Sequence, residues 1–130
     1  MCPDPDPSLT LPDFATLLDV GDLVFIRVPA RPFLEVAAAT DSWTNHVGVV
    51  VDTSGTQPLI GESTFPFSRM TALSRFIGRS EGGRVSVARL RATPTPEQQR
   101  QVLAAAQRRL RILYDTGFNL HSRRQFCSRY

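Results

Sequence analysis

The chain has 130 residues, of which 42% are hydrophobic and 21% are charged, and its net charge is +3. This length and composition are typical of one globular domain that buries a core without disulfides or metal ions. Because no apolar run approaches the roughly 18 residues that a membrane-spanning helix needs, we expect no membrane span.

The first residues differ from the rest in composition. Residues 1–7 read MCPDPDP, which is acidic and rich in proline, and they lack the basic and apolar regions of a secretory signal. We therefore expect a disordered tail at residues 1–10, a single domain at residues 11–130 and a cytoplasmic location. In that reducing compartment Cys2 and Cys127 are expected to stay reduced, although a disulfide between them remains open.

In chain order, the hydrophobic periodicity and the turn residues predict a helix, a strand, a helix, two strands, a helix, a strand and a helix, at residues 11–18, 23–27, 33–40, 46–52, 59–63, 67–77, 84–90 and 96–113. The strand at 46–52 is apolar nearly throughout, so we expect it to be central and covered on both faces. It is expected to form an antiparallel hairpin with the strand at 59–63. The predicted fold class is α+β, with helices packed on an antiparallel sheet.

Two of the predicted helices depend on specific signals. The helix at 96–113 has Thr95 as its N-cap and Pro96 at its first position, and Gln98 completes a capping box. The helix at 67–77 depends on apolar residues at helical spacing, namely Met70, Leu73 and Ile77.

The basic residues are all arginines, and seven of them lie from position 100 onward, against one acid, Asp115. Such a stripe can attract phosphates or an acidic substrate. The solvated face of a helix followed by a basic terminus explains it more simply. Because aromatic residues are not interleaved with these arginines, we expect no nucleic-acid partner.

One histidine and one cysteine lie in settings suited to chemistry. His46 opens the predicted central strand after a polar stretch, and Cys127 lies three residues from the end of the sequence. A thiol is a useful nucleophile when a base takes its proton, and imidazole is the usual partner. A cysteine hydrolase is predicted if the fold brings the two together. The structural alternatives are a buried, hydrogen-bonded histidine and a cysteine that acts as a small buried hydrophobe.

Glu62 lies in the next predicted strand, directly after Gly61. The hairpin would place its carboxylate near His46, where it would select the ring tautomer and stabilise the imidazolium. The alternative is an exposed glutamate at the end of a strand. The His and Cys residues show no zinc-type spacing, and no glycine-rich phosphate loop is present, so we expect no metal and no cofactor.

Five sequence blocks occur in a characteristic order, namely Gly21–Phe25, Asn45–Val49, Ile60–Glu62, Tyr114–Asp115 and Phe126–Ser128. Over residues 19–130 this pattern resembles the YiiX/YebB-like permuted papain-like cysteine hydrolases, of the permuted NlpC-type superfamily. The resemblance implies a circularly permuted papain-like core in which the His-bearing sheet comes first and the Cys last. Chain order does not affect the mechanism, because a triad is defined by geometry and roles.

The resemblance also implies roles for individual residues. Cys127 matches the nucleophile, His46 the base and Glu62 the residue that orients the base. The oxyanion or the substrate would be contacted by Tyr114 and Asn45, together with the backbone N–H of Cys127. In such relatives the Cys opens a helix of several turns, whereas three residues follow it here, so we expect a C-terminally short domain.

Two main functional hypotheses follow, and a third, nucleic-acid binding, rests only on the arginines. The first is a cysteine peptidase or amidase whose substrate is a peptide, another amide or an acyl lipid. The second is a non-catalytic module of the same fold that binds a lipid, a peptide or an anionic partner through its arginine-rich C-terminal face.

Overall fold

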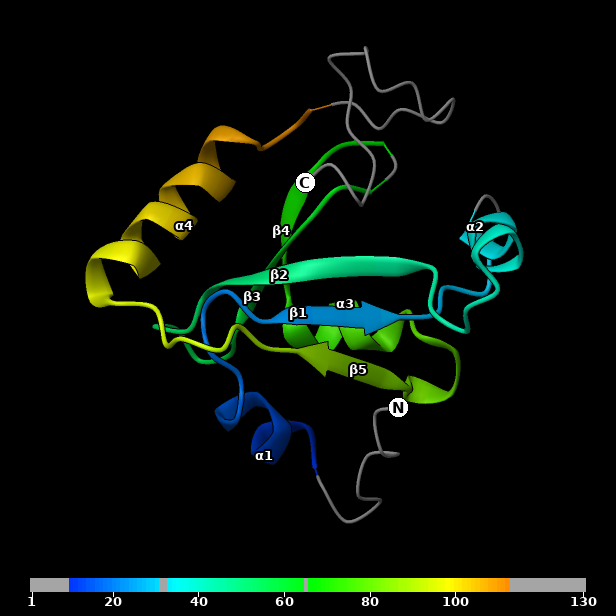
Figure 1. Ribbon diagram of the computed structural model, residues 1–130, viewed down its shortest axis with the longest axis horizontal. Helices are drawn as coiled ribbons and strands as arrows, with labels where there is room; N and C mark the ends of the chain where they lie inside the picture. Colours follow the sequence, from blue (N-terminus) through cyan, green and yellow to red (C-terminus); the bar gives the residue numbers. More distant parts are fainter. Residues whose placement is uncertain (1–9, 31–32, 65, 113–130) are drawn as a thin grey trace.

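A computed structural model of the protein describes residues 10–30, 33–64 and 66–112 (Figure 1). Its centre is a five-stranded antiparallel sheet with the strand order β4-β3-β2-β1-β5. In chain order, the strands are β1 (Leu23–Ile26), β2 (His46–Asp52), β3 (Leu59–Glu62), β4 (Arg69–Ala72) and β5 (Val85–Ala88). The α+β class and the central position of β2 are therefore as predicted.

The sheet is accompanied by four helices and one 3-10 turn within the described residues. These are α1 (Leu11–Thr16), α2 (Phe33–Thr40), α3 (Leu73–Gly78), η1 (Glu81–Gly83) and α4 (Pro96–Arg108). The predicted capping box of α4 is present, with the Thr95 side chain accepting from the Gln98 N–H and the Gln98 side chain accepting from the Thr95 N–H. No helix of the described ranges is both long and apolar enough to cross a membrane.

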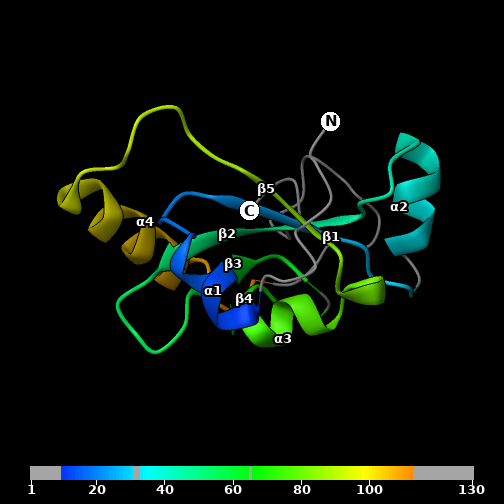
Figure 2. The ribbon, with the colours of Figure 1, turned by 90° about the horizontal axis from the view of Figure 1, so that it is seen from below.

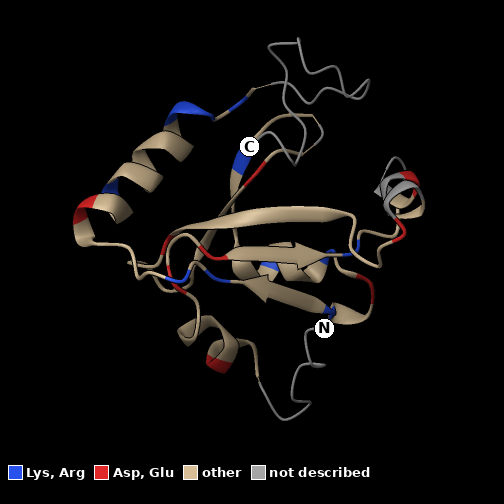
Figure 3. Cartoon of the chain, viewed as in Figure 1, with Lys and Arg blue, Asp and Glu red and all other residues tan. Residues whose placement is uncertain are grey.

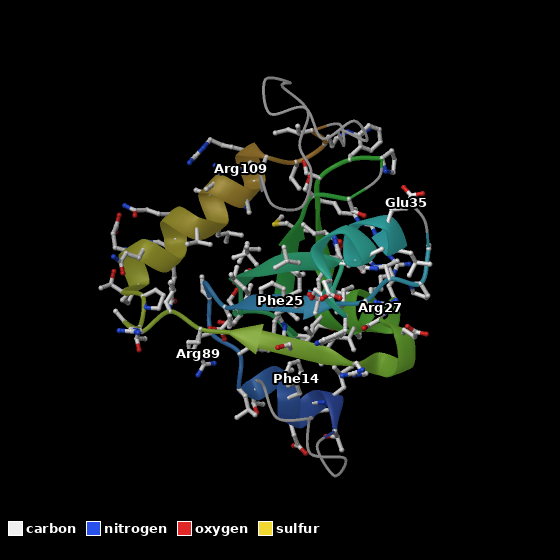
Figure 4. All side chains as sticks on the ribbon, turned by 45° about the vertical axis from the view of Figure 1, so that its right-hand side comes forward. Phe14, Phe25, Arg27, Glu35, Arg89 and Arg109 are labelled. Carbon is white, nitrogen blue, oxygen red and sulfur yellow. The ribbon has the colours of Figure 1, made fainter. Side chains whose placement is uncertain are left out.

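The hydrophobic core lies between the sheet and the layer formed by α1 and α3, which lie on the same face of the sheet (Figure 2). Figure 4 shows Phe14 directed from α1 toward the sheet, where it packs against the core. The buried members of this core are Leu18, Val24, Ile26, Val28, Val50, Ile60, Leu73 and Phe76. Strand residues two apart share a face, so His46 and Gly48 also face α3.

The segment expected to be one helix at 67–77 is instead a strand followed by a helix, so this prediction is wrong in its first half. Residues Arg69–Ala72 pair with β3 as the edge strand β4, and α3 begins only at Leu73. The apolar spacing that suggested a helix spans this boundary, since Met70 belongs to the strand and Leu73 to the helix. Short apolar runs of this kind do not distinguish the two structures.

The last helix is also shorter than predicted, since α4 ends at Arg108 rather than at residue 113. The chain beyond it bonds to Ser68 instead of continuing the helix. The N–H of Arg111 donates to the Ser68 carbonyl over 2.8 Å, and the N–H of Ser68 donates to the Ile112 carbonyl over 2.8 Å. Figure 4 labels Arg109 where the helix gives way to this segment. The expected disordered tail lies outside the described residues except for Thr10, which caps α1.

Gly48 provides the space for the centre of this core. A Cβ atom at this position would lie 2.3 Å from Cγ2 of Ile60 and 3.0 Å from Cε2 of Phe76. Both neighbours are completely buried, so neither has an open direction in which to move. The glycine therefore allows Phe76 to pack directly onto β2, beside His46.

We predict that Gly48→Ala lowers the free energy of unfolding by about 1–3 kcal/mol, the usual cost of overpacking a core. Urea denaturation measures this quantity. Gly78→Ala is the matched control, because no atom lies within 4 Å of a Cβ at that position. Equal stability of the two variants would contradict the role assigned to Gly48.

Candidate active site

His46 and Glu62 meet on the face of the sheet that carries the core. Nε2 of His46 lies 2.7 Å from Oε1 of Glu62, and neither side chain is exposed. The register of β2 and β3 explains the contact, since Val49 pairs with Gly61 and the next step sets Gly48 opposite Glu62. His46 is thus the diagonal neighbour of Glu62, within reach of a long side chain. The burial of Glu62 rules out the alternative of an exposed glutamate.

Three further side chains hold the Glu62 carboxylate. Nη2 of Arg79 lies 2.5 Å from Oε1, and Oγ1 of Thr71 donates to Oε2 over 2.5 Å. Nε of Arg69 lies 3.5 Å from Oε2, from the position directly opposite Glu62 on β4. Both carboxylate oxygens are therefore engaged, and two guanidinium groups offset the negative charge.

Burial raises the pKa of the Glu62 carboxyl, but the hydrogen bonds to His46 and Arg79 and the charge of Arg79 outweigh it and lower the pKa from 4.5 to about 2. Glu62 is therefore a carboxylate at neutral pH, and a carboxylate only accepts hydrogen bonds. The proton in the contact with His46 must then lie on Nε2. In neutral His46 this leaves the lone pair on Nδ1, the atom that can act as a base.

The imidazole ring is also positioned by its packing. The ring of Phe76 on α3 lies 5.7 Å from that of His46, centroid to centroid, and is tilted by 35°. Cζ of Arg79 lies 5.4 Å from the centroid of the same Phe76 ring. The aromatic ring therefore contacts both the histidine and the arginine that share the Glu62 carboxylate.

Asn45 precedes His46 and ties the start of β2 to the segment that follows β1. Its Oδ1 accepts from the Val28 N–H over 2.7 Å, and its Nδ2 donates to the Val28 carbonyl over 2.9 Å. The N–H of Asn45 donates to the Ile26 carbonyl over 3.1 Å. These contacts give the buried Asn45 a positioning role beside His46. A contact with substrate or oxyanion stays a prediction for this residue.

The other predicted site residues, Cys127 and Tyr114, lie outside the described residues. The side chains around Glu62 were not predicted from the sequence. Thr71 and Arg69 were missed because their strand was taken for a helix. Arg79 had no local signal, since it meets Glu62 only through the packing of α3 on the sheet.

The described part of the chain contains no group of three His, Cys, Asp or Glu side chains that could hold a metal ion. The Glu62 carboxylate is already bonded to His46, Arg79 and Thr71, and the neighbouring guanidinium groups disfavour a cation there. These residues present an imidazole that is held by Glu62 through Nε2 and whose Nδ1 is the nitrogen that can accept a proton.

The comparisons with known proteins agree with this fold. The chain belongs to the family of permuted papain-like amidase enzymes of the YaeF/YiiX type, the C92 family, whose sequence model matches residues 17–130. Among solved structures, it is similar to the crystal structure of metalloprotein YiiX from Escherichia coli O157:H7, with a TM-score of 0.77 and 28% identity. That similarity covers 85% of this chain and 61% of the YiiX chain. No curated protein matches the chain.

We predict that Glu62 makes stability depend on acid pH. Because its pKa is lowered from 4.5 to about 2 on folding, its contribution is fully present above about pH 5 and is lost as the pH falls toward 2. The whole contribution is roughly 3 kcal/mol, more than half of it lost by pH 3. Urea unfolding at pH 5 and pH 3 measures the change.

Glu62→Gln is expected to remove this part of the pH dependence. Glu97→Gln is the matched control, because Glu97 lies on the surface of α4 with its side chain 67% exposed. The account fails if the unfolding free energy of Glu62→Gln falls between pH 5 and pH 3 as steeply as that of the wild type.

Proposed function

We propose that the protein is a cysteine hydrolase that cleaves an amide, peptide or acyl-ester bond through Cys127, His46 and Glu62. The observation that carries the proposal is the buried contact between His46 and an ionised Glu62, in a chain that belongs to a family of amidases. The chain spans 61% of the solved YiiX chain, so the substrate and the reaction are proposed for this chain from its own residues.

In the proposed reaction, Nδ1 of His46 takes the proton of the Cys127 thiol, and the thiolate attacks the carbonyl carbon of the substrate. The resulting oxyanion is held by the backbone N–H of Cys127 and the hydroxyl of Tyr114. The C–N or C–O bond then breaks, and the leaving amine or alcohol takes the proton from His46. Water, deprotonated by His46, hydrolyses the thioester and restores the thiol.

Glu62 is proposed to orient the base without exchanging a proton. Its carboxylate accepts the Nε2 proton of His46, so Nδ1 is the nitrogen that faces the chemistry. When His46 gains a second proton, the negative charge of Glu62 stabilises the imidazolium. Thr71 and Arg79 support this role by holding both carboxylate oxygens in place.

The solved YiiX relative is described as a metalloprotein. The described residues of this chain do not fit such a site, because they contain no group of three candidate ligands and Glu62 is already bonded. We therefore derive no step through a metal. A cytoplasmic location, with a reduced Cys127 thiol, is part of the proposal.

The first test is the reactivity of the thiol. Both proteins carry Cys2→Ser, so that Cys127 is the thiol that reacts. At pH 6.5 iodoacetamide is expected to alkylate Cys127 at least ~10-fold faster when His46 is present than in the His46→Ala variant. The reason is that an unassisted thiol, with a pKa of about 8.5, is almost wholly protonated at that pH. Mass spectrometry gives the rates. His121→Ala is the control, and it is expected to react like the parent protein. Equal rates with and without His46 would show that the thiol is not activated by it.

The second test is turnover. The wild-type chain is expected to hydrolyse members of a panel of amides, peptides and thioesters, and Cys127→Ser is expected to remove that activity. Binding of the same compounds without turnover by the wild type would contradict the proposal and favour the non-catalytic module.

A further inference from the structure

Three arginines line a cavity formed by residues of β4 and α3. The cavity has a volume of about 460 Å³ and is lined by Arg69, Met70, Thr71, Ala72, Arg75 and Arg79. No acidic residue is among them. Figure 3 shows basic positions on both elements that form its walls, at the start of β4 and on α3.

The negative charge next to this cavity does not balance its positive charge. Glu62 contacts Arg69 and Arg79, but it is completely buried and both of its oxygens also accept from other groups. Arg75 is exposed and forms no ion pair or hydrogen bond with the rest of the described chain. Three guanidinium groups therefore face one carboxylate, and a net positive charge remains in the cavity.

Hydrogen-bond donors also remain unused at the same place. Nε of Arg79 is buried and has no acceptor among the described residues. Thr71 uses its hydroxyl on Glu62, so the free donors of the cavity belong to the arginines. Nε of Arg79 is closed to the cavity, so the donors that an anion there can reach are those of Arg69, whose side chain is 48% exposed, and of the exposed Arg75.

We propose that this cavity binds a phosphate group, either as the free ion or as a phosphate monoester. Arginine presents a planar set of donors that matches phosphate oxygens, and such charge-assisted bonds are stronger than neutral ones. A dianion fits a cavity in which three positive charges face one negative charge. The volume of the cavity leaves room for an organic part attached to the phosphate.

The proposed site adjoins the proposed active site through shared residues. Arg69 and Arg79 line the cavity and also contact Glu62, which in turn contacts His46. A bound phosphate would therefore compete with the Glu62 carboxylate for the guanidinium groups of Arg69 and Arg79. Phosphate binding itself does not depend on the proposed hydrolase function, and it is measured without reference to Cys127.

The test is isothermal titration calorimetry of the full chain with inorganic phosphate, at an ionic strength kept constant with sodium chloride. We expect saturable binding of one phosphate per chain. Arg75→Gln is expected to weaken binding by at least 10-fold, the effect of losing one charged hydrogen-bonding group. Because Arg75 is exposed and bonds to no described residue, this variant is expected to keep its fold, which circular dichroism checks.

Arg91→Gln is the matched control, since it removes the same charge from an exposed position in the loop between β5 and α4. It is expected to change the affinity by less than 2-fold. A parallel titration with glycerol 3-phosphate distinguishes the two ligands. Tighter binding of glycerol 3-phosphate than of inorganic phosphate indicates a site for a phosphate monoester, and tighter or equal binding of inorganic phosphate indicates a site for the free ion. No saturable binding, equal effects of Arg75→Gln and Arg91→Gln, or acetate binding as tightly as phosphate would each overturn the proposal.

Discussion

The structure depends on a carboxylate that stays ionised although it is completely buried. Removing such a group from water costs several kcal/mol, and the cost is offset only if its oxygens are bonded to donors of good geometry. Glu62 meets this condition through His46, Arg79 and Thr71, with Arg69 at a longer distance. Because these partners come from β2, β4 and the end of α3, the carboxylate joins the elements around the candidate site.

The same face of the sheet provides both the apolar core and the polar pair. Along β2, His46, Gly48 and Val50 point toward α3, and the missing side chain at Gly48 allows Phe76 to lie against the strand. The ring of His46 therefore packs against the ring of Phe76, and its Nε2 is held by the carboxylate of Glu62. Positioning of this kind, with rotamers held by packing and by a second set of hydrogen bonds, is what a base needs to act repeatedly in one geometry.

Much of this architecture could be predicted from the sequence. The strand at 46–52 and the helix at 33–40 have the predicted bounds, because one is apolar nearly throughout and the other follows the prolines at positions 29 and 32. The contact between His46 and Glu62 was a hypothesis based on the hairpin, with an exposed Glu62 as the alternative, and the register of β2 and β3 decides in favour of the contact. These are local patterns, and local patterns are what a single sequence displays.

The remaining features depend on long-range contacts. Residues Arg69–Ala72 form a strand because β3 offers them a free edge, and their own spacing suited a helix equally well. The helix α4 ends early because Ser68, more than 40 positions away, bonds to the chain that follows it. Arg79 reaches Glu62 only when α3 packs on the sheet, so no local sequence pattern predicts this contact.

The central claim is that, in the folded protein, Glu62 is ionised and accepts a hydrogen bond from a His46 ring that is protonated on Nε2. Nuclear magnetic resonance tests it directly, by following the Glu62 carboxyl carbon as the pH is lowered and by reading the ring nitrogens of neutral His46. The account predicts a carboxyl that titrates at about 2 and a neutral ring that carries its proton on Nε2. A carboxyl that titrates at or above 4.5, or a proton on Nδ1, would contradict it.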